Sequence, residues 1–422
     1  MHIRSININY DVMRMIRKIK CCCLCVFTMC LTLWLIFTLP LDHINAILPT
    51  KSRDLAQHGI RRDDPGRLPP FCDPATNLAF VKVHKAGSST VATLLQRFGI
   101  VHGLNFALPN RPFHDKFYNY ITRPGEILTR DSVVPLPPGK QYNILLNHAI
   151  YNRTAFRQLM PENTVYLTIL REPFQQFVSA FEYYNMASYF SSMVPSVRNA
   201  SNPISLYLSD PHAFEGESTL FSYIRNKQSE DLGLTRAAYD SPLVLNSSIN
   251  IIDREFLLVM IVERLDESLL LLKRELCWSV KDILYISKNA NTKKAKRSFT
   301  PSDHDNHRKL NHPDYALYGH FLKVLENKLD AQSADFFSEL KQFQFLLKGV
   351  KQACLTTASF YAAESRWHDS FNVTQEDCKL LLMSVTAGLD YLLLRAGRIT
   401  LQEYQKYRPH KPLWQEKTVH NL

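Results

Sequence analysis

The sequence predicts an α/β fold with a parallel central sheet flanked by helices. Four short, largely apolar runs are spaced along the chain, at residues 77–83, 142–146, 164–170 and 256–262. The first, third and fourth runs each lead into a stretch with apolar residues at helical spacing. Short apolar strands that alternate with helices are typical of a parallel sheet that is buried on both faces.

A polar pair follows each run, at the place where the strand is expected to end. The four pairs are His84-Lys85, Asn147-His148, Arg171-Glu172 and Glu263-Arg264. The ligand site of an open parallel sheet lies beyond the C-terminal ends of its strands. The sequence therefore predicts that these polar residues surround one site.

The segment after the first run has the features of an anion-binding loop. It reads His84-Lys85-Ala86-Gly87-Ser88-Ser89-Thr90 and precedes a helical stretch that extends to Phe98. A helix N-terminus offers free N–H groups and the positive end of the helix dipole, and both favour a bound phosphate. The three hydroxyls and Lys85 would add donors and positive charge. Since the lysine precedes the glycine, this is not a Walker A loop; an ordinary helix start with a solvated lysine is the alternative.

The third run ends in a second candidate. Arg171 follows the strand, and Ser179 lies eight residues later in a helical stretch that continues to about Tyr184. An arginine at a strand end and a serine in the next helix are able to bind a phosphate from two sides. Taken alone, a structural ion pair between Arg171 and Glu172 explains the same residues.

The rest of the chain has ordinary globular composition. Hydrophobic residues make up 45% and charged residues 21%, which excludes a largely disordered protein. Residues 185–255 are polar and contain several prolines, so we expect an insertion of loops and short helices there. Residues 314–350 and 376–406 have helical character.

The two anion-binding segments together resemble those of sulfotransferases that use 3′-phosphoadenosine 5′-phosphosulfate. More narrowly, the chain resembles the galactose-3-O-sulfotransferase family. The blocks that carry the resemblance are residues 80–91, Asn147-His148, 168–173 with Phe177, Ser179, Phe181 and Tyr184, 223–226 with 231–233, and 266–273 with 276–278. Two departures are Ala86-Gly87 in place of Thr-Ala and a more polar segment at Gln228–Glu230. They bear on the acceptor more than on the donor.

The resemblance implies a P-loop-like sulfotransferase fold and the transfer of a sulfuryl group to the 3-hydroxyl of a galactose residue. It implies that Lys85 stabilises charge on the oxygen that bridges to the leaving 5′-phosphate. The residues implied to hold the 5′-phosphate are Ala86, Gly87, Ser88, Ser89 and Thr90, and those implied to hold the 3′-phosphate are Arg171 and Ser179. The acceptor stays open among a galactose on a lipid, an N-glycan, an O-glycan and a proteoglycan.

The acceptor hydroxyl is a poor nucleophile and needs a base within hydrogen-bond reach. His148 is the first candidate for this base, and a hydrogen-bonded structural histidine is the alternative. His84 is the reserve candidate, although its place inside the anion loop favours a positioning role. The reaction requires no metal, and the sequence contains no evident cluster of metal ligands.

Two other functions compete with this interpretation. A metal-dependent Golgi glycosyltransferase would use Asp303-His304-Asp305 to hold a metal and a sugar nucleotide, although no apolar strand precedes the triplet. A non-catalytic lumenal binding protein of the same fold would be expected to lack Lys85 or Arg171, and both are present. The basic run at 293–297 is of a kind that most often forms a solvated loop, and here it would also help to attract an anionic cofactor. Nucleic-acid binding is not expected of a lumenal chain.

The N-terminal region predicts a membrane anchor. Residues 21–39 form an uncharged apolar run that is long enough for a membrane span, and basic residues gather before it. The positive-inside rule places residues 1–20 in the cytosol and the remainder in a lumen. A cleaved signal peptide is the alternative, but the run is longer than its usual apolar region. We expect a single-pass type II Golgi membrane protein with a stem at 40–74 and a lumenal sulfotransferase domain at 75–410.

Four cysteines lie outside the predicted span, at Cys72, Cys277, Cys354 and Cys378. An oxidising lumen would allow two disulfides among them, in three connectivities. The match of the block around Cys277 to the family, and the predicted helices beside Cys277 and Cys354, lead us to expect a Cys277–Cys354 bridge. Cys72 and Cys378 would then pair or stay free.

Four potential N-glycosylation sequons agree with a lumenal location. They begin at Asn152, Asn199, Asn246 and Asn372. Each tripeptide also arises by chance, so the sequence does not indicate which of them carry a glycan. It does not indicate the oligomeric state either.

Overall fold

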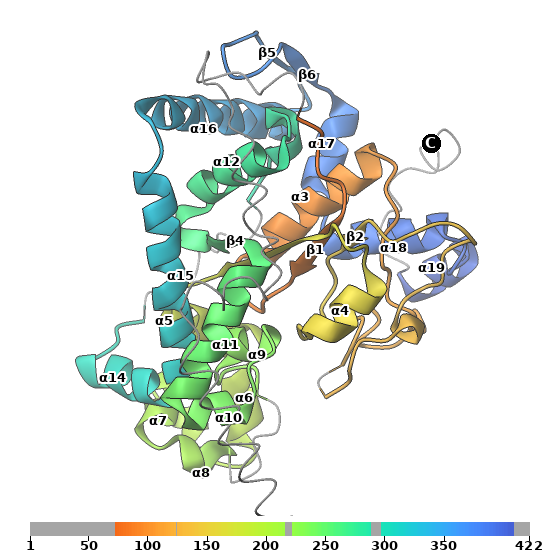
Figure 1. Ribbon diagram of the computed structural model, residues 1–422. Coiled ribbons are helices and arrows are strands. Elements are labelled where there is room, and N and C mark those ends of the chain that lie inside the picture. Colours follow the sequence, from red (N-terminus) through yellow and green to blue (C-terminus); the bar gives the residue numbers. More distant parts are fainter. Residues whose placement is uncertain (1–71, 124, 216–221, 288–296, 409–422) are drawn as a thin grey trace, which may run out of the picture. The chain divides into compact units, whose positions relative to one another are not determined.

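The computed structural model of the chain describes residues 72–123, 125–215, 222–287 and 297–408 (Figure 1). The predicted cytosolic tail, the predicted membrane span at 21–39 and the stem up to residue 71 lie outside the described residues, as does most of the basic run at 293–297. In the part that is described, no helix has the length and apolar character needed to cross a membrane.

A four-stranded parallel sheet forms the centre of the described part, as the sequence predicts. Its order is β2 (Ile144–Leu145), β1 (Leu78–Val81), β3 (Val165–Leu170) and β4 (Phe256–Ile261). Leu78 of β1 pairs in parallel with β2 and with β3, and β3 pairs in parallel with β4. Nearly all strand residues are buried. The four predicted runs are therefore neighbouring strands whose carboxyl ends meet at one edge.

The strand order decides which face each connecting helix covers. A right-handed crossover from β1 to β2 carries α3 (Ser88–Val101) over one face, and the return from β2 to β3 carries α4 (Arg153–Leu159) over the other. The connection from β3 to β4 ends in α11 (Pro242–Glu255), and α12 (Leu265–Leu276) follows β4. In the view of Figure 1, α3 and α12 lie above the sheet and α4 and α11 lie below it.

The connection between β3 and β4 is long and helical. It begins with α5 (Pro173–Tyr183), whose first N–H groups donate to the carboxylate of Glu172. Short elements follow, as predicted, and they are α6 (Met186–Ser191), the 3-10 helix η2 (Pro195–Asn199), α7 (Pro203–Ser209), α8 (Pro211–Glu215), α9 (Lys227–Asp231) and α10 (Arg236–Asp240).

The 14-residue helix α11 is the part of this connection that the sequence analysis did not predict. Its buried face is formed by Leu245, Ile249 and Ile252. Its outer face also carries apolar side chains, such as Leu243 and Ile251, which are 77% and 43% exposed. Apolar residues on both faces hide the helical period, which explains the missed helix.

A second apolar cluster fills the insertion between β3 and β4. Its members are mainly aromatic and include Phe174, Phe177, Phe181, Phe190 and Tyr207, all of them buried. Phe190 and Tyr207 stack with their ring centroids 5.4 Å apart. Because three of these rings belong to α5, the cluster fixes the orientation of the helix that directly follows the end of β3.

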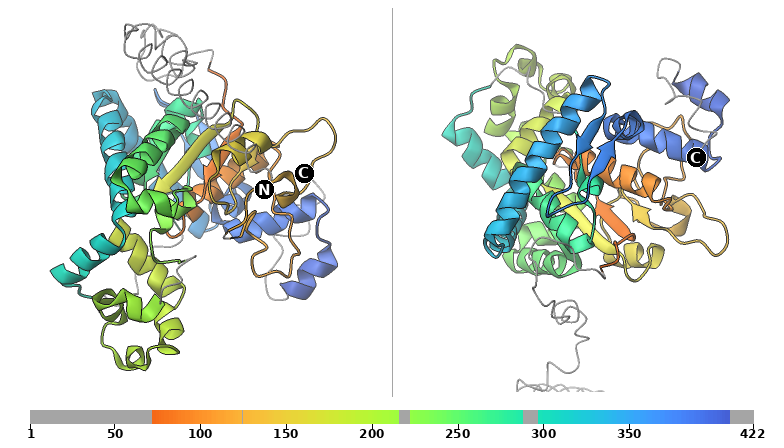
Figure 2. Two further views of the ribbon diagram at one scale, coloured as in Figure 1. Left: turned by 60° about the horizontal axis from the view of Figure 1, so that its bottom comes forward. Right: turned by 90° about the horizontal axis from the view of Figure 1, so that it is seen from above.

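The C-terminal part is helical and carries a small hairpin that the sequence analysis did not predict. Its helices are α13 (Val280–Ile283), α14 (Pro301–Leu310), α15 (His312–Asp330), α16 (Ala334–Leu355), α17 (Gln375–Leu382), α18 (Val385–Arg395) and α19 (Leu401–Tyr407). The hairpin pairs β5 (Phe360–Ala362) with β6 (Phe371–Val373). In the right-hand view of Figure 2, α16 is the long blue helix that runs beside this hairpin.

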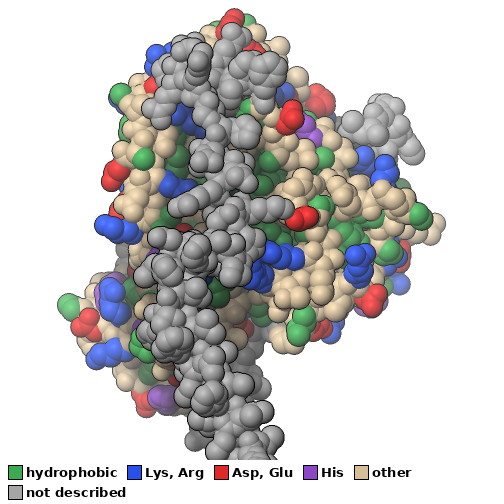
Figure 3. All heavy atoms as spheres, viewed as in Figure 1, with side chains coloured by type: hydrophobic (Ala, Val, Ile, Leu, Met, Phe, Trp, Pro, Cys, Tyr) green, Lys and Arg blue, Asp and Glu red, His purple; other side chains and the backbone are tan. Residues whose placement is uncertain are grey.

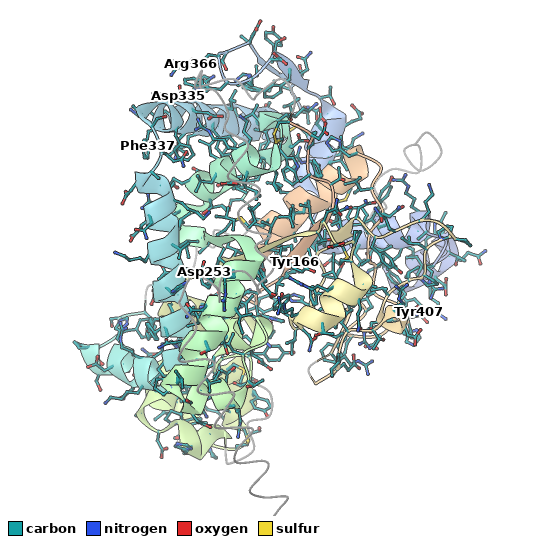
Figure 4. All side chains as sticks on the ribbon, viewed as in Figure 1. Tyr166, Asp253, Asp335, Phe337, Arg366 and Tyr407 are labelled. Atoms are coloured by element: carbon teal, nitrogen blue, oxygen red, sulfur yellow. A yellow bond between two sulfur atoms is a disulfide. The ribbon has the colours of Figure 1, made fainter. Side chains whose placement is uncertain are left out.

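The loop of the hairpin is fixed to the start of α16. Figure 4 shows the labelled side chains of Arg366 and Asp335 together at that end of the helix, and their Nη2–Oδ1 distance is 2.5 Å. The indole N–H of Trp367 donates to the same carboxylate at 3.1 Å. Arg274 of α12 lies 3.3 Å from it. One carboxylate therefore joins the hairpin, α16 and α12.

The predicted Cys277–Cys354 disulfide is wrong. The structure pairs Cys72 with Cys277 and Cys354 with Cys378. The segment before β1 runs along the end of α12, where a backbone hydrogen bond of 3.0 Å joins Ala75 to the last residue of that helix. Cys354 lies in the last turn of α16, and Cys378 lies in α17, which packs against it. Contacts between distant segments decide both pairs, and sequence spacing does not reveal such contacts.

Charged side chains are spread over the surface. On the face shown in Figure 3, Lys and Arg side chains are interspersed with Asp and Glu side chains over the described residues. The net charge of +11 is therefore not gathered into a single basic tract on that face.

A buried ion pair joins α12 to α16 and generates a stability prediction. The Lys273 ammonium lies 2.7 Å from Oε1 of Glu339, and the two side chains are 3% and 4% exposed. We expect Glu339→Ala to lower the free energy of unfolding by about 3–5 kcal/mol, because it leaves a buried ammonium without its counter-charge. Urea unfolding of the purified chain measures this loss.

The matched control is Glu326→Ala on the neighbouring helix α15. The Glu326 side chain is exposed and forms no ion pair with the described residues. Its removal should change the free energy of unfolding by less than about 0.5 kcal/mol. Equal losses in the two variants would contradict the stabilising role of the buried pair.

Candidate active site

The carboxyl ends of the parallel strands bring the predicted polar residues to one edge of the sheet. The imidazoles of His84, after β1, and His148, after β2, stack with their centroids 4.1 Å apart. After β3, Nη1 of Arg171 donates to the backbone carbonyl of Lys85 at 3.3 Å. Glu263, in the 3-10 helix η3 (Val262–Arg264) after β4, accepts the N–H of the residue that follows Arg171 at 3.0 Å. Residues from four separate strands therefore share one site.

The loop before α3 has a constrained backbone. Lys85 and Gly87 both have positive φ angles, of 59° and 74°. A Cβ atom on Gly87 would lie 2.5 Å from Cγ2 of Val262, so the position requires glycine for its φ angle and for its lack of a side chain. No side chain among the described residues caps the start of α3. The first turn of this helix therefore presents backbone N–H groups of the kind that bind anions.

The three hydroxyls of the loop have different surroundings. Ser88 is buried, and its hydroxyl donates to the carbonyl of Val83 at 2.6 Å. Its proton is therefore used within the loop. Ser89 is exposed and Thr90 is partly exposed in the first turn of α3. Of the three hydroxyls that the sequence suggested as phosphate donors, Ser89 and Thr90 have the suitable positions.

The side chain of Lys85 lies over an aromatic ring. Its ammonium is 3.5 Å from the ring centroid of Tyr183, a cation–π contact. Tyr183 is the last residue of α5 and is 68% exposed. The contact therefore holds the ammonium near the surface of the site, where a ligand has access to it.

His84 is held at both ring nitrogens. Its Nδ1 and its backbone N–H each lie 2.7 Å from Oδ2 of Asp231, and its Nε2 lies 2.9 Å from the hydroxyl of Tyr120. Burial lowers the pKa of His84 and outweighs the opposing effect of Asp231. The ring is therefore neutral at neutral pH, with Nδ1–H donating to the carboxylate and Nε2 accepting from the tyrosine. This arrangement favours the positioning role over proton abstraction.

His148 keeps one ring nitrogen for a ligand. Its Nδ1 lies 3.1 Å from the carbonyl of Lys82, which only accepts, so Nδ1 carries the proton and Nε2 carries a lone pair. No described residue forms a hydrogen bond with Nε2. Burial, and then the positive charge of Lys82, lower the pKa of His148 well below its ordinary value. The ring is therefore neutral, and Nε2 has the geometry to accept a proton, whereas the lowered pKa reduces its strength as a base.

Lys82 is a site residue that the sequence analysis did not single out. Its side chain is 7% exposed and forms no ion pair with the described carboxylates. Burial, and then the neighbouring Lys85, lower the pKa of Lys82 to about 8. A buried cation without a counter-charge favours an anion beside it. The available signal in the sequence was a single lysine within the apolar part of the first run, residues 78–83.

Arg171 is partly buried at the end of β3 and forms no ion pair with the described carboxylates. Burial lowers its pKa, whereas Glu263 and Glu172 raise it. The ion pair with Glu172, which the sequence left open, is not formed, because the carboxylate of Glu172 caps α5. Ser179 lies on the same helix and is partly exposed. The guanidinium therefore remains available for a phosphate.

The sequence analysis also missed a cluster of charged residues that contacts His84 through Asp231. The Lys227 ammonium lies 3.2 Å from Oδ1 of Asp231 and 3.0 Å from Oε2 of Glu230. Burial alone would raise the pKa of Asp231, but His84 and Lys227 bring it below its ordinary value. Asp231 is therefore ionised. The block 231–233 contributed to the family resemblance, yet nothing in the sequence paired its aspartate with His84.

Aromatic rings extend from the two histidines toward Lys85. Tyr120 stacks on His148 at a centroid distance of 4.7 Å, and Tyr223 lies 6.0 Å from His84. Tyr184 stacks on Tyr223 at 3.9 Å. Because Tyr183, next to Tyr184, lies under Lys85, these tyrosines form a continuous aromatic wall along the site.

The triplet Asp303-His304-Asp305 lies in α14 and not at a strand end. Oδ2 of Asp303 accepts from the N–H of Thr300 at 2.8 Å and from the hydroxyl of Ser205 at 3.0 Å. The carboxylate therefore caps a helix. Among the described residues, no group of three or more His, Cys, Asp and Glu side chains is arranged to hold a metal. The triplet gives no support to a metal-dependent glycosyltransferase.

Comparison with known proteins agrees with this geometry. A sequence profile of the galactose-3-O-sulfotransferase family matches residues 9–366. The chain belongs to this family. The resemblance to this family is thereby confirmed.

Individual members of the galactose-3-O-sulfotransferase family are similar to the chain at about the same level. Galactosylceramide sulfotransferase of Homo sapiens is 32% identical over 263 residues, which cover 62% of this chain and 59% of that protein. Galactose-3-O-sulfotransferase 2 of Homo sapiens is 31% identical over 261 residues, covering 61% and 62%. Galactose-3-O-sulfotransferase 3 of Homo sapiens is 33% identical over 280 residues, covering 61% and 60%. The matches therefore span about three fifths of the relatives' length.

The four sequons occupy accessible positions. Asn152, Asn199, Asn246 and Asn372 are all exposed. Asn152 also caps α4, through its Oδ1 atom, which accepts from the N–H of Ala155 at 3.0 Å. Exposure of these asparagine side chains is compatible with N-glycosylation at all four sequons.

The anion loop generates a prediction about Gly87. We expect Gly87→Ala to lower the free energy of unfolding by roughly 2–5 kcal/mol, because the left-handed backbone and the contact with Val262 both oppose a methyl group. Adding Val262→Ala should relieve the contact and recover part of the loss. Urea unfolding of the purified variants measures both effects.

Gly103→Ala is the matched control for Gly87→Ala. Gly103 has a φ angle of 66°, and a Cβ atom there would meet nothing within 4 Å. Its substitution should cost only about 1 kcal/mol, from the backbone alone. If the two alanine variants lose the same stability, the close approach of Val262 does not constrain the loop.

Proposed function

We propose that this chain transfers a sulfuryl group from 3′-phosphoadenosine 5′-phosphosulfate to the 3-hydroxyl of a galactose residue. Membership of the galactose-3-O-sulfotransferase family supports the reaction class. One arrangement supports it in this chain. A lysine in the loop between β1 and α3, an arginine after β3 and an imidazole with a free nitrogen after β2 share one edge of the sheet.

The residues of the site fit the negative charges of such a donor. Lys85, Ala86, Gly87, Ser88, Ser89 and Thr90 form the proposed 5′-phosphosulfate subsite, and Arg171 and Ser179 form the proposed 3′-phosphate subsite. Buried Lys82 adds positive charge beside Lys85. No described carboxylate pairs with Lys82 or Arg171. An anionic ligand would therefore lower the electrostatic free energy of both cations.

In the proposed transfer step, the bond between sulfur and the 5′-phosphate oxygen breaks as a bond between sulfur and the acceptor oxygen forms. Lys85 stabilises the negative charge that develops on the departing oxygen. The proton of the acceptor hydroxyl passes to Nε2 of His148, whose Nδ1–H is held by the carbonyl of Lys82. His84, fixed by Asp231 and Tyr120, keeps the stacked ring of His148 in place.

The aromatic wall supports a sugar acceptor. The C–H groups on one face of a galactose ring are weakly positive and pack on the negative faces of aromatic rings. The rings of Tyr120 and Tyr223 lie beside the two histidines, where the acceptor hydroxyl would be activated, and Tyr184 stacks on Tyr223. We assign the acceptor class as a galactose-terminated glycolipid or glycan.

A transfer assay with radiolabelled sulfate tests this function. The full-length protein would be offered the phosphosulfate donor and a panel of galactose-terminated lipids, N-glycans, O-glycans and proteoglycan linkage fragments. We expect label at the 3-position of galactose, in the presence of a chelator. Absence of transfer to every member of the panel, or label at another position, would contradict the proposal.

We also propose a single-pass type II orientation in the Golgi membrane, with residues 1–20 cytosolic, residues 21–39 in the membrane and residues 75–410 lumenal. The support is the charge asymmetry around the apolar run. Endoglycosidase treatment of the full-length protein should increase its gel mobility. Unchanged mobility, or a mature N-terminus near residue 46, would contradict this orientation.

Three alanine variants separate the roles in the proposed mechanism. Lys85→Ala should reduce kcat by about 10²-fold or more, because it removes the group that stabilises the departing oxygen. Arg171→Ala should mainly raise the donor KM, because its phosphate is remote from the breaking bond. His148→Ala should lower kcat and leave donor binding near normal. The measurements are steady-state kinetics and calorimetric binding of adenosine 3′,5′-bisphosphate.

Lys140→Ala is the control for these variants, because Lys140 is an exposed lysine outside the candidate site. It should change neither kcat nor the donor KM. Near-normal turnover in His148→Ala would contradict the role of His148 as the base and would favour His84 or a carboxylate such as Glu263. Normal nucleotide binding in Arg171→Ala would show that the 3′-phosphate subsite lies elsewhere.

The low pKa of Lys82 generates a pH prediction. The group is positive below its pKa of about 8 and neutral above it, so its attraction for the anionic donor is present at lower pH and is lost as the pH rises through about 8. The value of kcat/KM for the donor should therefore fall on the alkaline side. Lys82→Met should lower kcat/KM at neutral pH and remove this alkaline fall. An unchanged alkaline limb in the variant would contradict the assignment.

A further inference from the structure

The short helix α9 is anchored on α15 by one buried carboxylate. Oδ1 of Asp314 accepts from the N–H and the hydroxyl of Ser229, at 2.8 and 2.6 Å, and Oδ2 accepts from the N–H of Gln228 at 3.3 Å. All three residues are at most 3% exposed. Oδ1 of Asn311 also accepts the N–H of Asn226 at 2.6 Å. The start of α9 is therefore immobilised on a long helix outside the sheet.

From this position, α9 reaches the residue at the end of β3. The side chain of Gln228 accepts the N–H of Arg171 at Oε1 and donates from Nε2 to the carbonyl of Arg171, both at 2.9 Å. The amide thus pairs with the Arg171 peptide groups as a neighbouring strand would. A glutamine suits this task because its side chain donates and accepts at the same time.

The same helix also holds the first anion loop. Asp231, three residues after Gln228, accepts from the N–H and the Nδ1–H of His84. The two loops contact each other as well, since Nη1 of Arg171 donates to the carbonyl of Lys85 and Nε2 of Gln176 donates to the carbonyl of His84. One turn of helix therefore sets the distance between the two loops that carry the proposed phosphate subsites.

We propose that Gln228 is a positioning residue for the 3′-phosphate subsite. By holding both backbone groups of Arg171, it sets the point from which the guanidinium reaches the phosphate. The inference rests on the proposed function, because that function assigns the 3′-phosphate to Arg171.

The test compares two nucleotides that differ only in the 3′-phosphate. Calorimetry would measure the affinity of the full-length protein for adenosine 3′,5′-bisphosphate and for adenosine 5′-phosphate. The affinity for the bisphosphate divided by the affinity for the monophosphate, here called the affinity ratio, reports the 3′-phosphate subsite alone. We expect Gln228→Met to lower this ratio by about tenfold, because two hydrogen bonds to the Arg171 backbone are lost. Its affinity for adenosine 5′-phosphate should stay within about twofold of the original.

Ser229→Ala is the matched control. It removes an equally buried hydrogen bond from the same helix to Asp314, without a contact to Arg171. The backbone N–H groups of Gln228 and Ser229 still donate to Asp314 in this variant, so α9 stays anchored. We therefore expect lower thermal stability and an unchanged affinity ratio. A purely structural effect of α9 would lower the ratio in both variants, and that result would overturn the proposal.

A double-mutant cycle identifies Arg171 as the residue through which Gln228 acts. In the Arg171→Ala background, Gln228→Met should cause no further loss in the ratio. Additive losses would overturn the proposal. If Gln228→Met does not fold, Gln228→Asn serves instead, because its shorter amide cannot reach both backbone groups and should give the same tenfold loss.

Nucleotide binding by the unsubstituted protein distinguishes failure of this inference from failure of the proposed function. If this protein binds the two nucleotides equally, the proposed 3′-phosphate subsite fails, and the inference fails with it. If it prefers the bisphosphate and Gln228→Met keeps that preference, only the positioning role of Gln228 is overturned.

Discussion

The buried carboxylate of Asp231 is the group on which the candidate site depends. It accepts from the backbone and the ring of His84 and pairs with the buried Lys227 ammonium. Each of these groups would be costly to bury alone, and together they are stable because charge and hydrogen bonds are satisfied. The cluster fixes the loop that follows β1, and through the stacked imidazoles it fixes His148.

The cations of the candidate site differ in whether a carboxylate neutralises them. Lys227 has two carboxylate partners behind His84, whereas Lys82 and Arg171 form no ion pair with the described carboxylates. An unpaired buried cation destabilises the free protein and is stabilised when an anion binds. The positive charge that the described carboxylates leave uncompensated at this edge of the sheet therefore favours an anionic ligand.

Much of the fold was accessible from the sequence because its signals are local. Each buried strand is a short apolar run, and each of the helices α3, α5 and α12 has one apolar face, so the alternation was readable. The helix α11 was missed because apolar residues occur on both of its faces, and the hairpin β5–β6 was missed because its strands are short. The disulfide pairs depend on which segments meet in the fold, such as the segment before β1 and the end of α12, and no local pattern contains this information.

For the site, the sequence by itself determined the loop chemistry at the strand ends: Lys85 before the glycine, His148 after β2 and Arg171 after β3. Each of these follows a recognisable strand, so its place was fixed by the fold class. Only the tertiary structure decided that His84 is held at both nitrogens, that His148 keeps one free, and that Gln228 pairs with the Arg171 backbone. These roles depend on burial and on contacts between residues far apart in the chain, such as Asp231 with His84. A sequence gives the residue types in order, but the hydrogen-bond partner and the local dielectric that set a side chain's charge exist only after folding.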